Sequence, residues 1–304
     1  MRGSSDQLPA NTLPDNVRKG INDLLIKTIG TGILISDFKI IAGGCINNGG
    51  TIQTPAGSFF VKWNSAQHFP KMFDTESLGL SLLRSSNAIR VPRVIATDET
   101  DGIQFIILEF IRTERKTNTF WSDFGHQLAA LHQNTNARFG LDHDNYIGSL
   151  RQPNKPNASW VDFFIEQRLS YQLMIAEKAG LTSHELRKKF DALFKRLPEL
   201  FPTEQPSLIH GDLWSGNLIA DEFGKPCLID PAVYFGNKEI EMAYTELFGG
   251  FESDFYSAYY EIIPKQSGFK ERAEIYNLYP LLVHTNLFGQ TYLSQVEAIL
   301  SRFD

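Results

Sequence analysis

Cysteine is scarce in this chain, where Cys45 and Cys227 are the only two among 304 residues. So few thiols exclude a framework of several disulfides and favour a reducing, cytoplasmic compartment. No apolar run approaches the roughly 20 residues that cross a bilayer. The opening MRGSSDQLPANTLPD is polar and lacks the hydrophobic region of a signal peptide. We therefore expect residues 1–15 to form a flexible lead-in that stands outside the fold.

Positive charge is not in excess either. The 29 basic residues are outnumbered by 35 acidic ones, the formal net charge is -6, and both signs are spread along the chain. Without a basic block, we expect neither nucleic acid nor a membrane surface as a partner. Hydrophobic residues, at 42%, are sufficient for a packed core. The length predicts about two domains, or two lobes of one domain.

The first third of the chain has the patterns of strands. Two β-prone runs, 51–54 and 58–63, flank Pro55-Ala56-Gly57 and predict a hairpin. Leucines at helical spacing predict a helix over 73–86 that carries Glu76 on its first turns. Further strands are expected at 38–41, 91–97 and 103–111.

From about residue 113 the patterns become helical and rich in aromatic residues. Phe120, Phe124, Leu128 and Leu131 recur at helical spacing. Helix signals follow: N-caps at Ser159 and Thr182, a C-cap at Gly180, an end at Pro198, and a helical region over 238–303. The predicted class is α+β with two lobes. A small N-terminal lobe over 16–111 has an antiparallel sheet and one key helix, and a larger, mainly helical lobe spans 112–304.

The segment SLIHGDLWSGNLIADEFGKPCLID, residues 207–230, carries the chemistry. Asp212 and Asn217 form D-x-x-x-x-N, the spacing of the protein-kinase catalytic loop. There the aspartate accepts the proton of the substrate hydroxyl and the asparagine holds magnesium. Asp230 ends the apolar run CLI, and an amide oxygen with a carboxylate suits Mg2+. The pattern predicts Asp212 as base, Asn217 and Asp230 as metal ligands, and His210 as a brace for the loop.

A kinase also needs a lysine that a glutamate can hold against phosphate. Lys62 lies within the apolar run FFVKW, and Glu76 follows on the predicted helix. A buried lysine is costly without a carboxylate partner, so the two residues explain each other. On its own such a pair would be an ordinary ion pair. Together with the ordered D-x-x-x-x-N and hydrophobic-Asp elements it favours a kinase.

The nucleotide contacts are predicted from two further segments. Gly43, Gly44 and Asn47 lie between strands in GGCINNGG, where backbone N–H groups can approach phosphate closely. The alternative is a plain hairpin loop. The run IILEFI matches the connection between kinase lobes, and the backbone of Glu109 and Ile111 would bind the adenine edge.

Five longer blocks extend these motifs. They are HGDLWSGN (210–217), DPAVYFGNKEIEMAYTELFGGF (230–251), FGLDHDNYIGSLRQPN (139–154), WVDFFIEQRL (160–169) and LYPLLVHTNLFG (278–289). With them the chain resembles the fructosamine kinase (ketosamine 3-kinase) family, in the aminoglycoside-phosphotransferase-like branch of the protein-kinase-like fold. The resemblance runs from about Phe38 to Gly289. The chain departs from the family pattern at Gly49-Gly50, and Pro280 departs from an unbroken helical block.

This resemblance implies a kinase that depends on ATP and Mg2+. Its substrate would be a ketosamine, the adduct of a sugar with a protein lysine or a free amine, phosphorylated on the 3-hydroxyl as a step of protein deglycation and repair. Within this frame Trp214, two residues past the base, is a candidate to stack on the substrate, or else it packs the loop. Cys45 is a candidate for oxidation in an exposed loop, or else a small loop residue without a role.

Two readings from other classes stay open on the sequence alone. A related small-molecule kinase, acting on an aminoglycoside, choline or homoserine, would share the catalytic motif. A non-catalytic nucleotide-binding scaffold would share the fold but would not need all of Lys62, Glu76, Asp212, Asn217 and Asp230. Neither the choice between fructosamine and ribulosamine or erythrulosamine nor the oligomeric state follows from the residues.

Overall fold

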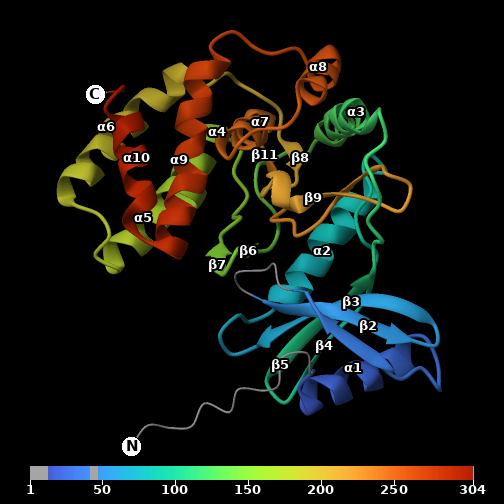
Figure 1. The fold of residues 1–304 in the computed structure, drawn as a ribbon. Coiled ribbons are helices and arrows are strands. Elements are labelled where there is room, and N and C mark those ends of the chain that lie inside the picture. Colours follow the sequence, from blue (N-terminus) through green and yellow to red (C-terminus); the bar gives the residue numbers. More distant parts are fainter. Residues whose placement is uncertain (1–12, 42–46, 304) are drawn as a thin grey trace, which may run out of the picture. The chain divides into compact units, whose positions relative to one another are not determined.

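The computed structural model describes residues 13–41 and 47–303, and the chain divides into two compact units (Figure 1). Unit 1 comprises Met1–Ser81 and Pro92–Arg112, and unit 2 comprises Leu82–Val91 and Thr113–Asp304. The segment 82–91 thus groups with the second unit, whereas the sequence predicted one continuous lobe over 16–111. The first helix begins at Asp15 and Leu13 is buried, so residues 13–15 belong to the fold and not to the lead-in predicted over 1–15.

Unit 1 is built on a five-stranded antiparallel sheet in the order β1-β2-β3-β5-β4. The predicted hairpin is present, with Thr54 paired to Gly57 across its turn. Buried residues of the sheet, among them Ile52, Val61 and Ile107, form its core. The elements are α1 (Asp15–Thr28), β1 (Asp37–Ile40), β2 (Asn48–Thr54), β3 (Gly57–Ser65), α2 (Met72–Ser85), β4 (Val94–Thr100) and β5 (Ile103–Glu109).

Helix α1 covers this sheet and was not predicted. Its buried residues Val17, Ile21 and Leu25 recur every four positions and join the same core as the strands. Gly20 allows the close approach, because a Cβ there would lie 2.9 Å from the ring of Phe105. The helix follows directly on a polar, proline-containing segment, and this hid its amphipathic period.

Unit 2 is mainly helical (Figure 1). Helix α3 packs on α8, and the carbonyl of Phe255 would lie 2.3 Å from a Cβ at Gly125, so only glycine permits this contact. Helix α9 packs against both α7 and α5. The helices are α3 (Phe120–His132), α4 (Trp160–Phe163), the π-helix η1 (Phe164–Leu169), α5 (Ser170–Lys178), α6 (His184–Leu200), the 3-10 turn η2 (Ser215–Asn217), α7 (Lys238–Leu247), α8 (Ser253–Ile262), α9 (Phe269–Phe288), the 3-10 turn η3 (Gln290–Tyr292) and α10 (Leu293–Leu300).

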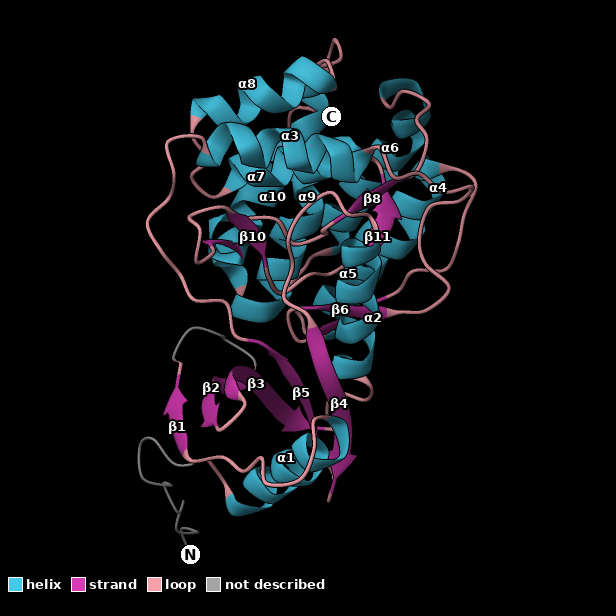
Figure 2. Cartoon of the chain, turned by 90° about the vertical axis from the view of Figure 1, so that its right-hand side faces the viewer, coloured by secondary structure: helices cyan, strands magenta, loops and turns pink. Residues whose placement is uncertain are grey.

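Three short two-stranded antiparallel sheets are set among these helices (Figure 2). The pairs β8–β11 and β9–β10 flank the segment 210–217, and β8 is fully buried, as the apolar run SLI indicated. The strands are β6 (Asn145–Ile147), β7 (Leu150–Gln152), β8 (Ser207–Ile209), β9 (Leu218–Ala220), β10 (Pro226–Leu228) and β11 (Tyr234–Gly236). None of the helices in the described part of the chain is both long and apolar enough to cross a bilayer.

Helix ends were predicted with mixed success. Ser159 does cap its helix, since its side chain accepts from the N–H of Asp162, and Gly180 follows α5 with φ 68°. The N-cap predicted at Thr182 is wrong, because the neighbouring Ser183 accepts from the N–H of Leu186. Pro198 does not end its helix, which continues to Leu200.

Pro280 likewise leaves its helix unbroken. It lies within the 20 residues of α9, although the sequence suggested an interruption there. A proline inside a helix removes one backbone hydrogen bond. The packing of α9 against α5 and α7 compensates, because ten of its residues besides Pro280 and Arg272 are buried.

Candidate active site

Asp212 lies in the loop between β8 and β9, and both oxygens of its carboxylate are held. The Nδ2 group of Asn217 donates to Oδ2 at 3.0 Å and to the backbone carbonyl of Asp212 at 2.8 Å. The hydroxyl of Tyr244 on α7 donates to Oδ1 at 2.9 Å. Two donors from different elements therefore fix the orientation of this carboxylate, as a positioned base requires.

The pKa values of Asp212 and Tyr244 are both raised. Burial raises the pKa of Asp212 above its ordinary value, although the charge of His210 and the hydrogen bond from Tyr244 oppose the rise. Burial and the carboxylate of Asp212 raise the pKa of Tyr244 well above 10.0, so its hydroxyl keeps its proton and remains a donor. The result is a carboxylate with increased proton affinity, which suits a group that accepts a proton from an alcohol.

Asn217 and Asp230 are brought together by the β9–β10 hairpin. Leu218 pairs with Leu228, and the N–H of Ile229 donates to the carbonyl of Asn217 at 3.0 Å. Asp230 directly follows this pairing, is exposed, and has φ 53°. This left-handed conformation is uncommon outside glycine and tolerated best by asparagine and aspartate.

The donor set of these two residues fits a hard divalent cation. The amide nitrogen of Asn217 is engaged by Asp212, which turns its Oδ1 away from that contact. An amide oxygen and a nearby carboxylate are ligands that Mg2+ accepts while it retains water and phosphate oxygens. Among the described residues no group of three or more His, Cys, Asp or Glu could hold a metal alone.

Glu241 on α7 supports the start of the loop and was missed in the sequence. Its carboxylate accepts from the N–H of His210 at 3.1 Å and from the N–H of Gly211 at 2.7 Å. His210 also contacts the carbonyl of Ile229 through Nε2 at 2.9 Å, as expected of a brace. The loop that carries Asp212 is therefore tied to α7 and to the segment before Asp230.

The carboxylate of Glu241 is itself paired. Its side chain and that of His132 are both 0% exposed, and Nε2 of His132 lies 2.9 Å from Oε2. Nδ1 of His132 contacts the hydroxyl of Tyr259 at 2.7 Å. Burial alone would raise the pKa of Glu241, but the hydrogen bond and charge of His132 hold it below the usual 4.5. The sequence signal for this group was a carboxylate in the otherwise apolar stretch IEMAY.

In unit 1, Lys62 and Glu76 form the predicted pair. Nζ of Lys62 lies 2.7 Å from Oε1 of Glu76, and the two side chains are 8% and 12% exposed. Lys62 is on β3, with β2 and β5 on either side, and Glu76 is on α2. A buried lysine that has a carboxylate partner agrees with the argument made from the sequence, that a buried lysine is costly unless it is paired.

The remaining nucleotide candidates differ in how they are placed. Gly43, Gly44 and Cys45 lie outside the described residues. The side chain of Asn47 accepts from Asn64 at 2.7 Å, which links the ends of β2 and β3. The backbone N–H of Glu109 donates to the carbonyl of Arg93 at 2.8 Å.

Ile111 follows β5 and is buried. Within the ranges that the structure describes, its backbone N–H has no hydrogen-bond partner in the protein. An amide of this kind can donate to a ligand.

Trp214 is 41% exposed. Its ring folds over the loop, because a Cβ at Gly216 would lie 2.3 Å from the indole Cη2. The indole therefore packs on its own loop with one side and presents the rest to solvent, so the geometry is compatible with both roles considered for it.

The fold recurs in solved phosphotransferases. An aminoglycoside phosphotransferase structure superposes with a TM-score of 0.59 at 16% identity, over 92% of this chain and 98% of that one. The fold is therefore the protein-kinase-like fold, as predicted. A crystal structure of a "putative fructosamine-3-kinase" from Haemophilus somnus matches with a TM-score of 0.85 at 30% identity, over 93% of this chain and 96% of that one.

The family follows from the sequence matches. The fructosamine kinase model matches residues 17–303. A "probable ketoamine kinase" of Synechocystis sp. is 40% identical over 91% of this chain and 93% of its own length. A chloroplastic protein-ribulosamine 3-kinase of Arabidopsis thaliana is 38% identical over 91% of this chain and 86% of its own length. The chain belongs to the fructosamine kinase family, which confirms the resemblance noted in the sequence.

Proposed function

We propose that this protein is a ketosamine kinase, which transfers the γ-phosphoryl group of ATP to a hydroxyl of a sugar–amine adduct. The observation that carries the proposal is the fixed carboxylate of Asp212, held by Asn217 and Tyr244 in a chain of this family. The names of the relatives support both the substrate class and the 3-hydroxyl as the position phosphorylated.

In this proposal Asp212 is the general base. It accepts the proton of the acceptor hydroxyl while that oxygen forms a bond to the γ-phosphorus and the bond to the ADP oxygen breaks. Its raised pKa supports the role, since a base with greater proton affinity removes the alcohol proton more readily. The ammonium of Lys62, oriented by Glu76, would contact the nucleotide phosphates.

We assign Mg2+ to Asn217 and Asp230, because their oxygen donors lie at one end of one hairpin. The metal would neutralise charge on the phosphates. The protein contributes the positions of the two ligands. The bond from Asn217 to Asp212 also couples the metal ligand to the base.

Single residues would supply the other contacts to nucleotide and substrate. Gly43, Gly44 and Asn47 would contact phosphate, while the backbone of Glu109 and Ile111 would bind adenine. Trp214, with its partly exposed indole, would stack on the acceptor sugar. Oxidation of Cys45 would block the nucleotide loop.

We further propose that the protein acts in deglycation in the cytoplasm. A phosphate on the 3-hydroxyl makes the adduct labile, so phosphorylation would lead to release of the amine. The small number of cysteines supports a reducing compartment.

One assay separates this function from its alternatives. The purified protein would be given Mg-ATP with a ribulosamine, a fructosamine, an aminoglycoside, or no acceptor, and ADP formation would be measured. We expect ADP only with the sugar–amine adducts, and the comparison of the two adducts gives the preferred sugar. Turnover with the aminoglycoside alone would identify the related small-molecule kinase, and nucleotide binding without any turnover would identify a scaffold.

A further inference from the structure

A group of partly exposed aromatic rings lies where α7 ends and α9 ends. The centroid of the His284 ring is 4.6 Å from that of Phe248, 5.1 Å from that of Tyr292 and 5.5 Å from that of Phe288. Phe248 and Phe288 each also contact Tyr292. We call these four residues, Phe248, His284, Phe288 and Tyr292, the aromatic wall.

The aromatic wall is joined to the base by one tyrosine. The ring of Tyr244 lies 5.9 Å from that of Phe248, and its hydroxyl donates to Oδ1 of Asp212 at 2.9 Å. Tyr244 therefore links the aromatic wall, through Phe248, to the group that would receive the proton.

The aromatic wall is partly open to solvent. Phe288 is 49% exposed, and the other three rings are half-buried. Large apolar side chains that gather at a surface beside a reactive group indicate a ligand surface more often than a core. The exposed part of the Phe288 ring is therefore available for contact with a ligand.

The ring of His284 has a defined tautomer. Nδ1 lies 2.8 Å from the carbonyl of Pro280, and a carbonyl only accepts, so Nδ1 carries the hydrogen. In the neutral ring Nε2 is then an acceptor. The aromatic wall thus offers ring faces and one acceptor nitrogen, and it contains no formal charge of its own.

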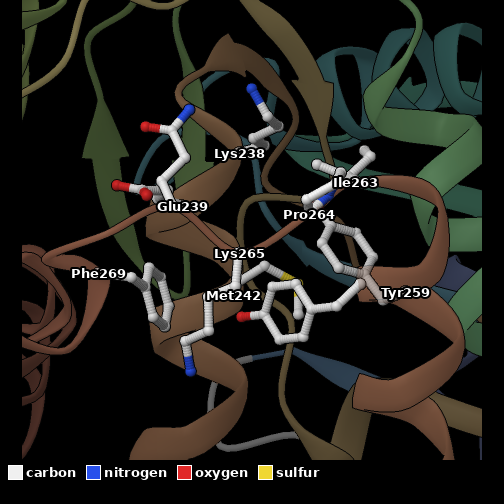
Figure 3. A pocket seen from close by; sticks show the side chains of 10 residues that line it. Lys238, Glu239, Met242, Tyr259, Ile263, Pro264, Lys265 and Phe269 are labelled. Carbon is white, nitrogen blue, oxygen red and sulfur yellow. The ribbon is translucent and has the colours of Figure 1, made fainter.

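A second aromatic surface in the same unit gives a useful contrast. The small pocket between α7, α8 and the start of α9 is lined by Phe269 and Lys265 (Figure 3) and by Tyr260. Nζ of Lys265 lies 4.6 Å from the centroid of Phe269 and 5.2 Å from that of Tyr260. Those ring faces already have a cation from the chain. In the part of the chain that the structure describes, no lysine or arginine lies over the aromatic wall.

We propose that the aromatic wall binds the protonated secondary amine of the ketosamine, beside the sugar hydroxyl presented to Asp212. The inference rests on the proposed function and names the part of the substrate that this surface recognises. A ketosamine differs from an ordinary sugar by that amine, which is cationic near neutral pH. Aromatic faces attract such a cation, and Nε2 of His284 can accept one of its N–H bonds.

The test compares two substitutions at one exposed position. Phe288→Leu keeps an apolar side chain but removes the π-face, whereas Phe288→Tyr keeps the face. The acceptors are the ribulosamine of propylamine and its 1-O-propyl analogue, which has oxygen in place of the amine. We expect Phe288→Leu to raise KM for the amine by about 3- to 30-fold, the range of one cation–π contact, with kcat little changed.

The same experiment includes its controls. KM for the oxygen analogue should change much less, and Phe288→Tyr should retain the KM of the unmodified protein. Phe223→Leu is the matched control, because Phe223 is 71% exposed at the far turn of the β9–β10 hairpin. Thermal midpoints measured for all three variants should agree, since none of these rings is buried.

Two results would overturn the inference. If Phe288→Leu leaves both KM values unchanged, the aromatic wall does not contact the acceptor. If Phe288→Leu raises KM for both acceptors by the same factor, the surface contributes apolar contact and does not recognise the amine. A protein that turns over neither substrate, yet binds Mg-ATP, would overturn the proposed function itself and this inference with it.

Discussion

The two halves of the candidate machinery hold their charges in opposite ways. In unit 1, Lys62 is neutralised by Glu76, a full ionic partner 2.7 Å away. In unit 2, the oxygens of Asp212 are held by the neutral donors Asn217 and Tyr244. A cation against Asp212 would lower its pKa and weaken it as a base, whereas a carboxylate against Lys62 keeps the ammonium charged. The difference teaches that a group that binds charge and a group that moves a proton require different partners.

The largest effect should come from the base. Asp212→Asn preserves the size of the side chain but removes the group that accepts the proton. We expect kcat to fall by about 10²- to 10⁴-fold, the usual contribution of a general base. Mg-nucleotide binding, measured by calorimetry, should be largely retained because Asn217 and Asp230 remain. Asp142→Asn, at a side chain that is 92% exposed, is the control, and substantial activity in Asp212→Asn would contradict the assignment.

The next largest effect should come from Glu241, whose carboxylate supports the loop that carries Asp212. Glu241→Gln leaves two backbone N–H donors and buried His132 with a neutral, partly mismatched partner. We expect a loss of about 3–5 kcal/mol in the free energy of unfolding, the cost of breaking a buried pair, measured by denaturant titration. Glu76→Gln is the counterpart in unit 1. Glu76→Gln should lower the free energy of unfolding by less, because the Lys62–Glu76 pair retains slight exposure. Equal losses in the two variants would contradict this difference between the two pairs.

The same carboxylate gives a pH dependence. The pKa of Glu241 is lower in the folded protein than the usual 4.5. A carboxyl of this kind contributes stability that is fully present above its unfolded pKa and is lost as the pH falls through the folded one. The unmodified protein should therefore lose stability below pH 4.5 more steeply than Glu241→Gln. Parallel acid profiles of the two proteins, followed by circular dichroism, would contradict this.

The sequence predicted the groups that lie close together along the chain. Lys62 and Glu76 are one strand and one helix apart, and Asp212 and Asn217 share a loop. Their spacing along the chain was therefore enough to predict that they act together. Glu241 and His132, in contrast, act on that loop from helices 31 and 78 residues away from His210. No local pattern marks such a partner, because the contact exists only after α3 and α7 have packed.

Predictions of helices and of their ends were limited in the same way, because local sequence does not show how a helix packs. The period of Phe120, Phe124 and Leu128 predicted α3 because all three face one core. The cap at Ser183 was displaced by one residue, since Thr182 and Ser183 offer the same hydroxyl and the turn decides between them. Pro198 and Pro280 were given too much weight, because side-chain packing stabilises a helix after one backbone bond is lost.

The smallest effect should come from Tyr244, the neutral donor that holds Oδ1 of Asp212. Tyr244→Phe removes the hydroxyl that fixes Oδ1 of Asp212 but keeps the ring that contacts Phe248. We expect kcat to fall by about 10-fold, which corresponds to one hydrogen bond to a charged group at the lower end of its range. KM for ATP should not change. A residue that only packed would lower the thermal midpoint and leave kcat unaltered.

Tyr256→Phe is the matched control for this substitution. Its hydroxyl accepts from the N–H of Phe251 and contacts Thr245, with no bond to Asp212. The two variants lose the same atom from nearby helices, so they differ only in what that atom holds. If both lowered kcat equally, the orientation of Asp212 would not depend on its neutral donor. Lys62 and Asp212 would then differ only in the charge of their partners, because the hydrogen bond from Tyr244 would not matter for the position of Asp212.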